Sequence, residues 1–102
     1  MYRARDRVDE EEWLSVLEDA AATLGVSEDV RTTARDLYLS AVPENERSKP
    51  PVVAAGLYAA ALVEGEQRSQ SAVADAVGVS RVAVQQRWKE LLRGAGLEAP
   101  SW

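Results

Sequence analysis

The stretch SQSAVADAVGVSRVAVQQRWKELL, residues 69–92, decides the fold of this chain. Gly78 divides it into two segments with helical spacing of apolar residues, and Ser69 and Ser80 stand where helix N-caps are expected. The positions expected to bury one shared face are Val73, Val77, Val79, Val84, Trp88 and Leu91. Two such helices joined at a glycine are typical of a helix-turn-helix, whose second helix can lie in the DNA major groove. Plain helical packing units share this pattern, so the stretch alone leaves both interpretations open.

The composition bounds what the rest of the chain can do. Its 102 residues suffice for one domain with a single core. The absence of cysteine and histidine excludes disulfides, thiolate metal sites and the commonest general base. There is no phosphate-binding glycine loop or carboxylate pair at catalytic spacing, so we expect no enzyme, cofactor, metal or small-molecule substrate. The longest apolar run, residues 51–63, is too short to span a bilayer. We therefore expect a cytoplasmic, nucleoid-associated protein with no membrane contact.

Charge is distributed unevenly along the chain. The net charge is −5, and only two of the twelve basic residues are lysines. Residues 1–49 carry 12 acids against 7 bases, whereas residues 66–94 carry 3 acids against 5 bases. The acidic surface over a core of Ala and Val suits a halophile, and a GC-rich genome is the alternative explanation. The net positive charge of residues 66–94 has the sign that DNA binding requires.

Caps and glycines predict the remaining elements in order. Residues 1–9 are expected to form a flexible arm whose three arginines, at positions 3, 5 and 7, either keep the terminus soluble or touch phosphates or a partner protein. A helix is predicted over residues 10–24 with Asp9 as its N-cap, and a second helix follows Ser27 and stops near Pro43. Residues 96–102 form a tail, in which Trp102 either folds back onto the core or is exposed.

The segment that begins at Pro50 and Pro51 and ends at Gly65 is apolar all round. Proline is tolerated in a first helical turn, so the pair favours a helix start there. A helix without a polar face has to be surrounded by other helices. With the helices expected at 70–77 and 81–93, the count reaches five, and this third helix is predicted to lie at the centre.

Residues 47–92, RSKPPVVAAGLYAAALVEGEQRSQSAVADAVGVSRVAVQQRWKELL, resemble the second cyclin-like repeat of archaeal transcription factor B, the counterpart of eukaryotic transcription factor IIB. The shared features are an Ala-rich helix with one Tyr, a Ser-Gln opening, and a Ser-x-Val-x-Val-x-x-Arg-aromatic-Lys-Glu-Leu helix. The resemblance extends more loosely over residues 10–95. It implies an all-α, five-helix cyclin-like domain with a central apolar third helix and a helix-turn-helix over residues 69–92.

The resemblance also implies a function and a set of partners. It predicts a DNA-binding transcription initiation factor domain that recognises a promoter element next to the TATA box together with TATA-binding protein. RNA polymerase and full-length transcription factor B are further candidate partners. Within these 102 residues there is no zinc ribbon and one repeat rather than two, as expected of either an excised domain or a small stand-alone paralogue, and Ala72 stands where the family often has Glu.

The first turns of the second helix in a helix-turn-helix face base edges. The residues that we expect to contact bases are Arg81, Val82, Gln85 and Gln86. The residues that we expect to contact phosphates are Arg68, Ser69, Gln70, Ser80, Arg87 and Lys89. Each also has an ordinary explanation, because serines cap helices and glutamines are good surface helix formers.

The small number of basic residues predicts weak DNA binding by the domain alone. Affinity that comes from counterion release fades as salt rises, so useful binding requires base contacts or a partner already on the DNA. The alternative hypothesis is a protein–protein adaptor, or a competitor of the basal transcription machinery, without DNA specificity of its own. The acidic first half would then supply its binding surface.

Overall fold

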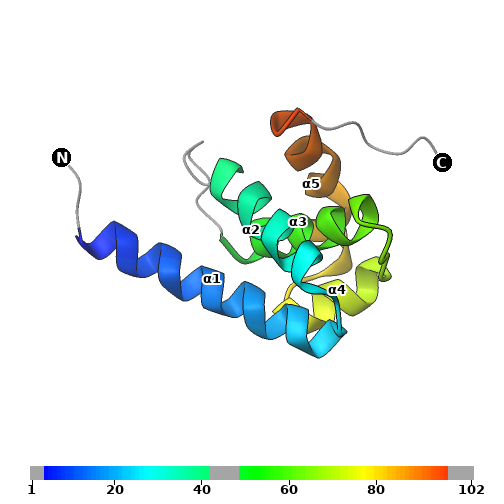
Figure 1. Cartoon of the computed structure of the whole chain (residues 1–102), viewed down its shortest axis with the longest axis horizontal. Coiled ribbons are helices and arrows are strands. Elements are labelled where there is room, and N and C mark those ends of the chain that lie inside the picture. Colours follow the sequence, from blue (N-terminus) through cyan, green and yellow to red (C-terminus); the bar gives the residue numbers. More distant parts are fainter. Residues whose placement is uncertain (1–3, 42–48, 97–102) are drawn as a thin grey trace.

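Helix α3 (Lys49–Val63) lies at the centre of the molecule, and the four other helices all contact it (Figure 1). The structure is a computed structural model that describes residues 4–41 and 49–96, with side chains for residues 11–40 and 49–96. The surrounding helices are α1 (Ala4–Leu24), α2 (Glu28–Ala41), α4 (Gln70–Val77) and α5 (Arg81–Gly94). The expected all-α, five-helix architecture with a central third helix is therefore confirmed.

Small side chains bring α3 close to its neighbours. All residues from Val52 to Leu62 are buried, which is possible only because helices cover every side of α3. Helix α3 lies close to α2 at Gly56, since a Cβ atom placed there would lie 3.5 Å from the carbonyl oxygen of Ala34 and 3.8 Å from the Cβ atom of Leu37. The Ala-rich sequence of α3 thus sets the spacing of the bundle.

Helix α1 begins earlier than the sequence predicted. It starts at Ala4, so residues 4–9 are helical rather than part of a flexible arm, and Asp9 lies inside the helix instead of capping it. Ala and Arg are strong helix formers, and extending an existing helix costs far less than nucleating one. Figure 1 shows these first turns reaching past the other helices. Arg3 and the side chains of Arg5 and Arg7 lie outside the described part of the chain.

The other helix boundaries lie close to those predicted. Helix α2 ends at Ala41, α4 ends before Gly78, and α5 includes Gly94 before the chain turns at Gly96 with φ +80°. Of the predicted tail, only Gly96 is described, so Trp102 lies outside the described residues. None of the helices in the described ranges has the length and apolar character needed to cross a bilayer.

Candidate nucleic-acid interface

Local sequence fixes the turn between α4 and α5. The hydroxyl oxygen of Ser69 accepts a hydrogen bond from the backbone N–H of Ala72 at 3.0 Å, and that of Ser80 accepts one from Ala83 at 3.2 Å. Gly78 adopts the left-handed conformation, with φ 94° and ψ 35°, and its N–H donates to the carbonyl of Ala74 at 2.7 Å. Both predicted N-caps and the glycine turn are therefore confirmed, and α4 and α5 form a helix-turn-helix.

The inner face of α5 holds this unit on the core. Val84, Trp88 and Leu92 are its buried residues, four positions apart, and the Trp88 ring meets the Tyr58 ring edge-on at a centroid distance of 5.3 Å. Leu91, which the sequence analysis expected to face inward, is only partly buried. Residues four positions apart lie on nearly the same side of a helix, so Leu92 continues the buried row of Val84 and Trp88.

The exposed residues of α5 are Arg81, Val82, Gln85, Gln86, Lys89, Glu90, Arg93 and Gly94. We call the first five of these the outward face. All four side chains expected to contact bases are exposed in the first two turns of α5. Val82 is 53% exposed, more than any other large apolar side chain in the described ranges. An exposed valine between an arginine and two glutamines can contact a thymine methyl group, while its neighbours can offer hydrogen bonds to base edges.

The side chains expected to contact phosphates are placed less uniformly. Ser69 and Ser80 sit at the N-termini of α4 and α5, where their O–H groups remain available as donors. Gln70 and Arg87 are half-buried. The ammonium nitrogen of Lys89 lies 5.6 Å from the centroid of the Trp88 ring, within the range of a cation–π interaction. Helix N-termini and cations of this kind favour anions.

Arg68 has a structural role that the sequence analysis missed. Its guanidinium donates hydrogen bonds to four backbone carbonyl oxygens, at distances of 2.9 to 3.3 Å. The acceptors are Leu24 and Gly25 at the end of α1, and Glu66 and Gln67 in the linker before α4. All three guanidinium nitrogens are engaged in this way. Arg68 therefore joins two turns, and we leave it out of the proposed phosphate contacts.

Glu66 strengthens the same junction. Its carboxylate accepts hydrogen bonds from the backbone N–H of Ser27, at 2.9 Å, and from the Ser27 hydroxyl. These two bonds, with the nearby Arg68 charge, lower the pKa of Glu66 below its ordinary value of 4.5, although partial desolvation acts in the opposite direction. Glu66 and Arg68 together fix the linker that leads into Ser69. The only sequence signal for this junction is a pair of opposite charges shortly before an N-cap.

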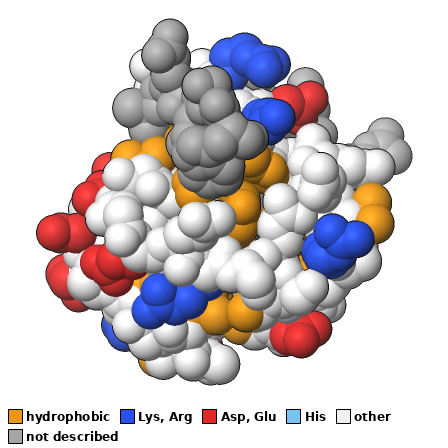
Figure 2. Space-filling view, turned by 90° about the vertical axis from the view of Figure 1, so that its right-hand side faces the viewer, with side chains coloured by type: hydrophobic (Ala, Val, Ile, Leu, Met, Phe, Trp, Pro, Cys, Tyr) orange, Lys and Arg blue, Asp and Glu red, His pale blue; other side chains and the backbone are white. Residues whose placement is uncertain are grey.

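The electrostatics of the helices differ strongly. Helix α5 carries four basic residues and one acid. In α1 and α2, Arg31 and Arg35 both pair with Glu18, at 3.2 and 3.1 Å, so the remaining acids dominate that surface. On the side of the molecule that Figure 2 shows, most of the visible acidic side chains gather at one edge, whereas the basic ones are spread over the view. An approaching polyanion is therefore favoured at α5 and disfavoured at α1 and α2.

The sequence of the chain is similar to those of known proteins. Residues 15–94 match the family model of the transcription factor TFIIB repeat. The chain is 40% identical over 83 residues to transcription initiation factor IIB of Pyrococcus abyssi, covering 78% of this chain and 28% of the relative. It is 38% identical over 81 residues to the factor of Archaeoglobus fulgidus and 35% over 81 residues to that of Methanopyrus kandleri. These matches cover 76% of this chain and 24% and 26% of the relatives.

The chain spans about a quarter of the length of these curated relatives. The family consists of transcription factors, which supports the expectation that the chain is not an enzyme. The five helices agree with a cyclin-like repeat, and the relatives are archaeal. This chain belongs to the family of transcription factor TFIIB repeats.

Proposed function

We propose that the outward face of α5 contacts a promoter element beside the TATA box, and that it does so together with TATA-binding protein. The observation that carries this proposal is the division of α5 into two faces. One row of three residues holds the helix on the core, while Arg81, Val82, Gln85 and Gln86 are exposed side by side. Since none of these four side chains is buried, all are free to contact another molecule.

Each exposed side chain of α5 has a role that its chemistry supports. Arg81, in the first turn of the helix, can donate two hydrogen bonds to guanine, and Gln85 or Gln86 can pair with adenine. Val82 supplies an apolar contact for the thymine methyl group. The phosphate contacts come from the N-terminal turns of α4 and α5 and from two cations on α5, namely Ser69, Gln70, Ser80, Arg87 and Lys89. These contacts position the helix without selecting a sequence.

The chain is expected to bind DNA weakly by itself. The net charge of −5 and the few basic residues limit the affinity that counterion release can supply, and salt reduces it further. TATA-binding protein already seated on the promoter would place α5 beside its element and lower the entropic cost of binding. The function is thus that of one member of a promoter assembly.

Fluorescence anisotropy of a labelled promoter duplex, measured at high salt with and without TATA-binding protein, tests this proposal. We expect little or no binding by the chain alone and a clear rise in affinity when the partner is present. A duplex with the TATA-flanking sequence scrambled is the control and should lose the gain. Tight binding alone, unchanged by the partner, would overturn the cooperative mode of binding.

Two finer assignments complete the proposal. The closeness of residues 47–92 to the second repeat of archaeal transcription factor B favours that repeat as the counterpart. The acidic surface and the scarcity of lysine favour a haloarchaeal source. RNA polymerase and full-length transcription factor B remain further candidate partners.

The acidic surface of α1 and α2 favours one alternative function. A chain that binds a basic protein there would act as an adaptor, or as a competitor of full-length factor B, without contacting bases. Promoter occupancy of the variant Arg81→Ala with Gln85→Ala separates the two functions. Base contact predicts that occupancy falls, whereas an adaptor or competitor without DNA specificity keeps its occupancy unchanged.

A further inference from the structure

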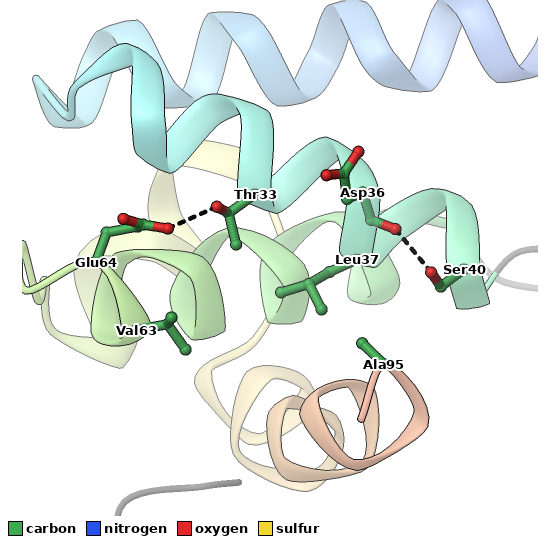
Figure 3. A pocket seen from close by; sticks show the side chains of 7 residues that line it. All are labelled: Thr33, Asp36, Leu37, Ser40, Val63, Glu64 and Ala95. Atoms are coloured by element: carbon green, nitrogen blue, oxygen red, sulfur yellow. Dashed lines mark hydrogen bonds between the residues drawn. The ribbon is translucent and has the colours of Figure 1, made fainter. Parts of the chain in front are cut away.

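A groove opens at the end of α5 that is remote from Arg81. It has a volume of about 420 Å³ and is bounded by the second half of α2 and by the C-terminal ends of α3 and α5 (Figure 3). The residues that line this C-terminal groove are Thr33, Asp36, Leu37, Ser40, Val63, Glu64 and Ala95. Because α5 is 14 residues long, the groove lies about 20 Å from the start of the helix. DNA on the outward face would leave the groove accessible.

The charge of the C-terminal groove is of one sign. Asp36 and Glu64 are exposed at its rim, and none of the described residues that line it is basic. Helices α3 and α5 end beside it, at Val63 and Gly94. Several of the last carbonyl groups of α3 and α5 accept hydrogen bonds from the residues that follow, so the negative charge of the groove rests on the two carboxylates. The groove therefore favours a cation.

The C-terminal groove also has an apolar part. Leu37 lines its base but is only 2% exposed, so the accessible apolar surface comes from Val63, which is 41% exposed (Figure 3). A hydrogen bond of 2.7 Å from the Thr33 hydroxyl to the Glu64 carboxylate joins α2 to the end of α3 and fixes one wall. An aliphatic chain that ends in a positive charge matches this combination, because its stem can cover apolar atoms while its head reaches the carboxylates.

We propose that the C-terminal groove binds a lysine or arginine side chain within a basic segment of a partner protein. The stem packs on Val63, and the charged head lies at the rim, near the carboxylates of Glu64 and Asp36. The negative charge of α2 attracts a basic protein segment, and the same charge repels nucleic acid. The domain then joins two partners, with DNA at the outward face of α5 and a protein at the opposite end of that helix.

Chemical-shift mapping of the ¹⁵N-labelled full chain tests this proposal. The probe is the blocked peptide Gly-Leu-Arg-Leu-Lys-Gly, added at increasing concentration. We expect amide shifts confined to residues 33–40, Val63, Glu64 and Ala95. Asp36→Asn with Glu64→Gln should weaken binding about five- to tenfold, since each exposed ion pair contributes modestly. Val63→Ser should weaken it about threefold through the lost apolar contact.

A matched pair of variants controls for total charge. Glu12→Gln with Asp19→Asn removes the same two charges from exposed positions on α1 and should leave peptide affinity unchanged. Equal weakening by both pairs, or shifts spread over other helices, would overturn the proposal. Contacts of residues 97–102 with Val63 in the free chain, or shifts that change with protein concentration without peptide, would assign the groove to this chain itself or to a second copy. Promoter affinity should be the same for all these variants, so failure here is distinct from failure of the DNA proposal.

Discussion

Helices α3 and α5 are almost equal in length, with 15 and 14 residues, yet they are built on different principles. Eleven consecutive residues of α3 are buried, whereas α5 buries only three, each four positions from the next. Core packing therefore restricts which side chains are tolerated at nearly every position of α3, but at only one row of positions in α5. The outward face of α5 is left for recognition, so stability and DNA contact depend on different side chains.

The largest effect expected from this difference follows truncation of α3. Leu57 is fully buried, so Leu57→Ala should lower the free energy of unfolding by about 2–5 kcal/mol through lost burial and the cavity left behind. Val82→Ala on α5 is the matched control and should change stability by less than about 0.5 kcal/mol, because Val82 is exposed. Urea unfolding followed by circular dichroism measures both. Equal losses would contradict the division between the two helices.

A smaller loss of stability is expected when the hydrogen bonds that fix the linker before α4 are removed. Arg68→Ala deletes four hydrogen bonds to carbonyl groups and should cost about 1–3 kcal/mol. Arg81→Ala removes the same side chain from the outward face of α5 and should leave the thermal midpoint almost unchanged. If Arg81→Ala destabilised the chain as much as Arg68→Ala, the outward face would be part of the fold rather than free for recognition.

Two glycines should respond to alanine in opposite directions. Gly78 has φ 94°, so Gly78→Ala should cost about 1–2 kcal/mol although no atom lies within 4 Å of the added methyl group. Gly56 is helical, and its added methyl group would make ordinary contacts at 3.5–3.8 Å. Gly56→Ala should therefore stabilise the chain by up to about 1 kcal/mol. Thermal unfolding of the two variants checks both signs, and destabilisation by Gly56→Ala would mean that α2 and α3 cannot accept even one methyl group.

The smallest expected effect concerns pH and the junction before α4. The pKa of Glu66 is lowered in the folded chain, so its stabilisation is fully present above pH 4.5 and is lost as the pH falls through the lower folded value. The thermal midpoint of the wild type should exceed that of Glu66→Gln near neutral pH, and the gap should close in acid. A gap that stays constant down to about pH 3 would show that the Glu66 charge does not stabilise the junction.

Much of the fold followed from short-range patterns. Ser69, Ser80 and Gly78 predicted both helix boundaries of the turn, and the absence of polar residues predicted that α3 is central. The start of α1 was predicted wrongly because Asp9 satisfies the local preference for a cap, while the residues before it favour a helix equally well. A residue that favours the N-cap position does not mark the start of a helix when the residues before it are also strong helix formers.

The features missed by the sequence analysis are those that join distant segments. Arg68 bonds to Leu24, 44 positions earlier, and Glu66 bonds to Ser27, 39 positions earlier. The C-terminal groove likewise combines α2 with the ends of α3 and α5. Such contacts depend on how the helices pack, which spacing within one helix does not reveal. The outward face of α5, by contrast, could be predicted because it is the complement of a buried row on the same helix.

The most direct test of the account is the affinity of the variant Arg81→Ala with Gln85→Ala for a promoter duplex that carries TATA-binding protein. Each lost base contact costs about 1–3 kcal/mol, so we expect binding to weaken at least about tenfold while the thermal midpoint of the chain stays unchanged. A duplex with altered flanking sequence should bind wild type and variant alike. Unchanged affinity of the variant for the promoter would contradict the assignment of the outward face of α5 to DNA.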